Sequence, residues 1–66
     1  MNAERIERQR AIAWAIRGVL KQVQDAECRQ MLADRALLIE VADSPDDVLK
    51  LLGEVAALGM QIERLA

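Results

Sequence analysis

The clearest pattern in the chain is a repeat of apolar residues in its last third. These residues are spaced alternately by three and four positions, at Val48, Leu51, Val55, Leu58, Ile62 and Leu65. Such spacing places all of them on one face of an α-helix. Ser44 is a favourable N-cap for this helix, and Pro45 suits its first position because the missing N–H is not needed there. We therefore predict a turn over residues 43–45 and a helix over about 45–65.

The first two thirds of the chain carry apolar positions that change sides partway along. One stripe consists of Ile12, Ile16, Val19, Leu20 and Val23. Beyond residue 24 the apolar positions rotate around the helix, to a set that includes Leu32 and Ile39. Proline and other loop-forming residues are missing between the two stripes, and helix connections usually contain them. The pattern therefore favours one continuous helix over about 3–42.

This reading predicts an all-α helical hairpin, with a long N-terminal helix and a short C-terminal one. Their lengths would be about 60 and 30 Å, so half of the first helix would have no partner within the chain. Since a soluble protein does not leave a long apolar stripe in water, we expect a homodimer with four-helix-bundle character. Its interface would be formed by the apolar stripe Ile12, Ile16, Val19, Leu20 and Val23.

A break near Gln24 and Asp25 is the alternative to the long helix. Asp25 is a favourable N-cap for a second helix. Three helices of moderate length would then follow one another, and the chain would form a compact three-helix bundle.

The composition excludes most kinds of catalytic and metal site. The 66 residues are 53% apolar and 30% charged, and they include one Cys and no His or Tyr. One thiol cannot form a disulfide within the chain, and without His it can neither complete a zinc site nor be activated as a nucleophile. We therefore predict a single helical domain over residues 1–66 that is not an enzyme and needs no cofactor or metal.

The charges divide the chain into a basic and an acidic part. Residues 1–24 contain five basic and two acidic side chains, whereas residues 25–66 contain four basic and nine acidic ones, for a net charge of −2. This balance argues against general nucleic-acid binding. The N-terminus lacks the apolar stretch of a signal peptide, and no apolar run is long enough to span a membrane. Because the free Cys28 also suits a reducing compartment, we expect a cytoplasmic protein without a membrane partner.

The single aromatic residue, Trp14, lies among basic side chains. Its nearest basic neighbours along a helix are Arg10, Arg17 and Lys21. These four positions share one face, nearly opposite the stripe that contains Ile12. An aromatic residue next to arginine is typical of the centre of a protein–protein interface. We therefore predict that these four residues bind a partner protein, and the alternative is that Trp14 lies within the homodimer interface.

The function that these observations favour is contact with another protein. The chain would be a small regulator or adaptor that occludes or bridges a site on its partner, and the apolar flank of Leu32 and Ile39 is a second candidate docking surface. In size and layout it resembles plasmid copy-control RNA-binding dimers, small co-chaperones of type III secretion needle subunits, and early phage proteins that inhibit host factors. The phage type of inhibitor fits best, because RNA-binding hairpins need a more basic face. A nucleic-acid-binding regulator that uses the N-terminal basic face, or a co-chaperone subunit of a secretion assembly, is the alternative.

Overall fold

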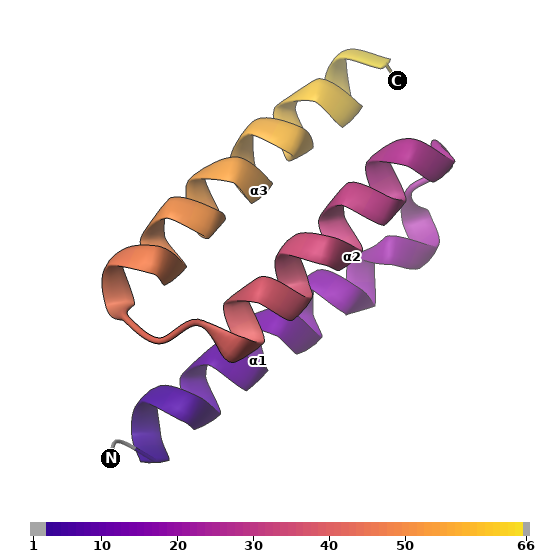
Figure 1. The fold of residues 1–66 in the computed structure, drawn as a ribbon. Coiled ribbons are helices and arrows are strands. Elements are labelled where there is room, and N and C mark those ends of the chain that lie inside the picture. The colour runs from indigo at the N-terminus through magenta and orange to yellow at the C-terminus, as the bar shows by residue number, and fades with distance from the viewer. Residues whose placement is uncertain (1–2, 66) are drawn as a thin grey trace.

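The computed structural model, which describes the backbone of residues 3–65 and the side chains of residues 3–62, is a three-helix bundle (Figure 1). Its elements are α1 (Ala3–Val19), a short 3₁₀ turn η1 (Leu20–Gln22), α2 (Ala26–Val41) and α3 (Pro45–Leu65). Helix α2 runs antiparallel to both of the other helices. The predicted all-α class is confirmed, in the form of the compact three-helix alternative.

The continuous helix predicted over residues 3–42 is wrong, because the chain breaks after η1. Val23 and Asp25 both have extended backbone conformations. Asp25 then caps α2, since its Oδ1 accepts a hydrogen bond of 2.9 Å from the backbone N–H of Cys28. The guanidinium of Arg29 donates to the carbonyl oxygen of Val23 at 3.1 Å, which satisfies an acceptor next to the break. This break allows α2 to fold back along α1.

The second turn forms where the sequence predicted it. Helix α3 begins at Pro45, and the backbone N–H of Asp47 donates to Oγ of Ser44 at 3.2 Å. Ser44 is therefore the N-cap of α3, as its position before a proline and an apolar repeat indicated.

The repeat of apolar residues on α3 forms the side of that helix that joins the core. Val48 and Leu58 are buried, and Leu51, Val55 and Ile62 are partly buried against the same core. The sixth residue of the repeat, Leu65, has a side chain outside the described residues.

The core lies along α2, which packs against both α1 and α3, whereas α1 and α3 scarcely approach each other. Its buried apolar residues are Ala13, Ile16, Val23, Cys28, Leu32, Ala36, Ile39, Val48 and Leu58. The two alanines, Ala13 on α1 and Ala36 on α2, are fully buried. Small side chains at these positions allow two helices to pack closely.

The apolar stripe that was predicted to form a dimer interface packs largely into the core of the single chain. Ile16 and Val23 are buried, Ile12 and Leu20 are partly buried, and Val19 is exposed by about half. Three helices therefore bury within one chain much of the apolar surface that a hairpin would leave in water. The unpaired half-helix from which the homodimer was predicted is therefore not found among the described residues, and the structure of one chain does not test the homodimer itself.

The described helices do not meet the requirements of a membrane span. None of those within residues 3–65 combines the length and the apolar character that crossing a bilayer demands.

Candidate functional site

Trp14 is the most exposed large apolar side chain in the described part of the protein. Its exposed fraction is 73%, although its neighbour Ala13 and the nearby Ile16 are buried against α2. Within the chain, nothing therefore covers most of the indole. Because an indole has a large apolar area, its exposure makes this position the first candidate for a contact with another molecule.

Arg17, three residues further along α1, is held by an ion pair with Glu40 of α2. Its Nη2 lies 3.1 Å from Oε1 of Glu40, and its Nη1 lies 3.3 Å from Oε2. This two-pronged hydrogen bond lowers the pKa of Glu40 and raises the pKa of Arg17. The pair joins α1 to α2 at the surface, so the charge of Arg17 is largely compensated and its guanidinium is held at α2.

Arg10 and Lys21 are exposed on either side of Trp14 along the chain. Arg10 lies one helical turn before it, and its charge makes a smaller contribution to the lowered pKa of Glu40. Lys21 lies in η1, about two turns after Trp14. We call the group Arg10, Trp14, Arg17 and Lys21 the Trp14 face. The Trp14 face lies on the surface of the single chain. Arg17 is held there by its ion pair with Glu40, whereas Arg10 and Lys21 are exposed.

The prediction that the apolar flank of Leu32 and Ile39 is a second docking surface is wrong. Both side chains are buried in the core, because they lie on the side of α2 that contacts the other two helices. The exposed large apolar residues of α2 are instead Leu37, Leu38 and Val41.

Gln9 is a residue that the sequence analysis did not single out. It is a polar side chain with only 3% of its surface exposed. Its Nε2 donates to the carbonyl oxygens of Ile39 at 2.8 Å and of Ala42 at 2.9 Å. Carbonyls at the end of a helix lack partners within the helix, so Gln9 attaches α1 to the end of α2. Its spacing of four and seven residues from Ala13 and Ile16 is the signal that could have placed it on the buried side.

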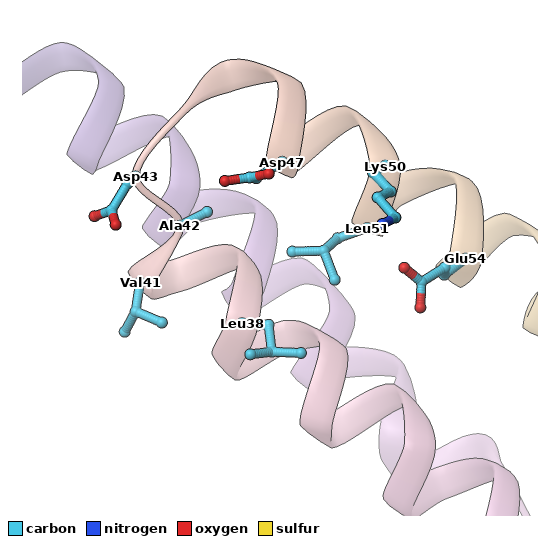
Figure 2. Close-up of a pocket in the computed structure, with 8 residues that line it drawn as sticks. All are labelled: Leu38, Val41, Ala42, Asp43, Asp47, Lys50, Leu51 and Glu54. Atoms are coloured by element: carbon cyan, nitrogen blue, oxygen red, sulfur yellow. The ribbon is translucent and has the colours of Figure 1, made fainter.

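A shallow pocket of about 330 Å³ lies where the end of α2 meets the start of α3 (Figure 2). Figure 2 shows Leu38 of α2 and Leu51 of α3 between the two helices, with the charged residues Asp47, Lys50 and Glu54 following along α3. Glu54 is engaged by Arg35 of α2, with 3.3 Å between Oε1 and Nη2. The described residues around this pocket carry charges of both signs, with Lys50 among the carboxylates of Asp43, Asp47 and Glu54.

Cys28 is buried at the start of α2 and forms part of the core. Burial is the main cause that raises the pKa of its thiol, and the charge of the nearby Asp25 raises it further. Both effects disfavour the thiolate, which is the reactive form of cysteine. The thiol therefore acts as a small apolar side chain in this fold.

Comparisons with protein-family models, curated proteins and solved structures find no match for the chain. A functional proposal therefore depends on the surfaces that the fold exposes. The Trp14 face is the surface on which an aromatic side chain and exposed cations coincide.

Proposed function

We propose that this chain is a small, non-enzymatic regulator that binds another protein through the Trp14 face. The observation that carries the proposal is the exposure of Trp14, at 73%, which is the highest among the large apolar side chains of the described residues. An exposed tryptophan that becomes buried at the centre of an interface typically contributes about 2–4 kcal/mol to binding. No other described side chain offers so large an apolar contact.

The charges around Trp14 define the kind of partner that suits it. Arg10 and Lys21 are exposed cations, whereas Arg17 is already compensated by Glu40. A partner with an apolar pocket and carboxylates at its rim would complement both features. The proposed mode of action is to occlude or bridge a site on that partner, as expected for an inhibitor or adaptor.

The proposal is tested by capture of a partner on the tagged, full-length chain. The Trp14→Ala variant should lose a partner that the unchanged chain retains, and Lys21→Glu should weaken the capture. Val41→Ala is the matched control, because Val41 is also an exposed apolar residue but lies on α2. Circular dichroism should show the same helix content for all three variants.

Two results would contradict this function. One is equal capture of the partner by Trp14→Ala and by the unchanged chain. The other is binding to random-sequence duplex DNA with a steep salt dependence, which would favour a nucleic-acid-binding regulator instead.

A further inference from the structure

A second surface lies between α1 and α3, on another side of α1 from the Trp14 face. The groove has a volume of about 280 Å³ and is lined by Arg5, Arg8, Gln9, Ile12, Pro45, Val48, Leu49 and Leu52. Ile12 and Trp14 are two residues apart on α1, so their side chains point to nearly opposite sides of the helix. The two surfaces are therefore separate.

The groove exists because α1 and α3 both pack against α2 but scarcely against each other. Its floor is apolar, with Val48 buried and with Ile12 and Leu52 partly buried. Leu49 stands at its edge with 66% of its surface exposed. In a four-helix bundle, a fourth helix would fill the space between two such helices. The shape and the apolar lining therefore suit an amphipathic helix.

The described residues that line the groove carry charge of a single sign. They include Arg5 and Arg8 but no carboxylate, although the whole chain has a net charge of −2. Arg5 is anchored at one end, since its Nη1 donates to the carbonyl oxygen of Asp43 at 2.8 Å. Arg8 is exposed, one helical turn from the partly buried Ile12. The groove therefore presents a positive edge beside an apolar floor.

We propose that this groove binds an acidic amphipathic helix of a partner protein. The apolar side of that helix would lie against Ile12, Leu49 and Leu52, and its carboxylates would lie beside Arg8. A second copy of this chain fits less well, because two grooves placed face to face would bring the exposed Arg8 of each copy together, and the described lining offers no carboxylate between them. The proposal does not depend on the Trp14 face, and with both surfaces occupied the chain would bridge two proteins.

The test uses a synthetic probe and the full-length chain. The probe is a fluorescein-labelled peptide of about 18 residues, long enough for a helix of about 27 Å, with leucine at heptad positions and glutamate or alanine elsewhere. Fluorescence anisotropy should show binding of this peptide. A peptide of the same composition in scrambled order, and one with lysine in place of glutamate, should each bind at least about tenfold more weakly.

Two substitutions at exposed positions assign the binding to the groove. Leu49→Ser removes an apolar contact, and Arg8→Glu reverses the charge at the edge. Each should weaken binding of the acidic peptide about fivefold or more, and Arg8→Glu should also improve binding of the lysine peptide. The matched controls are Val41→Ser on α2 and Lys50→Glu on α3, both at exposed positions outside the described lining of the groove and outside the Trp14 face. They should change the affinity less than about twofold.

Three outcomes would overturn the proposal. The first is equal affinity for the amphipathic and the scrambled peptide. The second is an equal loss of binding in Arg8→Glu and Lys50→Glu, which would indicate a general charge effect. The third is a dimer of this chain that Leu49→Ser dissociates, since a second copy would then occupy the groove.

Discussion

At the scale of single residues, two side chains of this protein depart from the usual distribution of polar and apolar groups. Gln9 is polar and almost fully buried, whereas Trp14 is large, apolar and mostly exposed. The amide nitrogen of Gln9 is satisfied within the chain, because it donates two hydrogen bonds to the end of α2, whereas its Oε1 is buried without a hydrogen-bond partner among the described residues. Trp14 has no comparable contact that covers it, which is why we assign it to binding and not to stability.

Replacement of Gln9 by alanine should destabilise the fold by about 1–3 kcal/mol. The substitution removes the side-chain donor to the carbonyl of Ala42, leaves the carbonyl of Ile39 with only a 3.4 Å hydrogen bond from the backbone N–H of Ala42, and opens a small space between α1 and α2. Urea denaturation monitored by circular dichroism measures the effect. Gln22→Ala is the control, because Gln22 is exposed in η1, and its effect should stay within about 0.5 kcal/mol. Equal effects of the two substitutions would contradict the role assigned to Gln9.

The ion pair between Arg17 and Glu40 should make part of the stability depend on pH. The hydrogen bond from Arg17 lowers the pKa of Glu40 in the folded state below its ordinary value of 4.5. The stabilising contribution of the ion pair is therefore fully present above pH 4.5, and it is lost as the pH falls through the lowered pKa that Glu40 has in the folded protein. Since 37% and 27% of the two side chains are exposed, the contribution should be small and sensitive to salt.

Thermal melts of the unchanged chain and of Glu40→Gln across this pH range provide the measurement. The difference in Tm should be largest near neutral pH and should shrink as the solution becomes acidic. A difference that grows towards acidic pH would contradict the assignment of the ion pair.

At the scale of elements, the break between α1 and α2 is what changes the architecture from a hairpin into a bundle. The shift of the apolar positions beyond residue 24 was the signal for it. A single helix with two stripes needs different neighbours along its length, whereas two helices can turn both stripes towards one core. The lack of loop-forming residues favoured continuity, but local preference is weak, and packing of the core overrides it here.

Asp25→Ala should destabilise the protein by about 1 kcal/mol, because it removes the acceptor for the N–H of Cys28 at the start of α2. Asp25→Asn is the matched control, since the amide oxygen can accept the same hydrogen bond and asparagine is also a good N-cap. Chemical denaturation of both variants separates the effect of the capping hydrogen bond on stability from the effect of the negative charge. If the two substitutions lower the free energy of unfolding by the same amount, the capping hydrogen bond does not stabilise the break between α1 and α2.

At the scale of the whole molecule, α2 is the common partner of the other two helices, and α1 has surfaces left on either side of that contact. One is the Trp14 face and the other is the groove shared with α3. The protein measures about 41 × 19 × 14 Å, and its helices lie along the long direction (Figure 1). This arrangement suits an adaptor, because two partners could bind along the same helix without overlapping.

We expect light scattering to give the mass of one chain, 7.4 kDa, and not twice that value. Ile16 and Val23, from the stripe that predicted a dimer, are already buried within the bundle. The fluorescence of Trp14, recorded on the same sample, should be red-shifted and accessible to acrylamide. A dimer with a blue-shifted, protected Trp14 would instead place that residue in a homodimer interface and would contradict the Trp14 face as a free binding surface.

The sequence by itself determined the features that depend on neighbouring residues. It predicted the all-α class, the start of α3 at Ser44 and Pro45, and the apolar repeat on that helix. It also placed Trp14 among Arg10 and Arg17 on one side of α1. Caps and helical spacing involve residues three or four positions apart, so their energetics can be read from a short stretch of chain.

Only the tertiary structure decided how the helix faces pair with one another. It ended the first helix before Asp25, buried the stripe of Ile16 and Val23 within one chain, turned Gln9 inward, and left the groove between α1 and α3 open. These outcomes depend on contacts between residues up to about 40 positions apart, as between Arg5 and Asp43. Each local pattern is compatible with more than one such pairing, and the packing of all three helices around α2 selects among them.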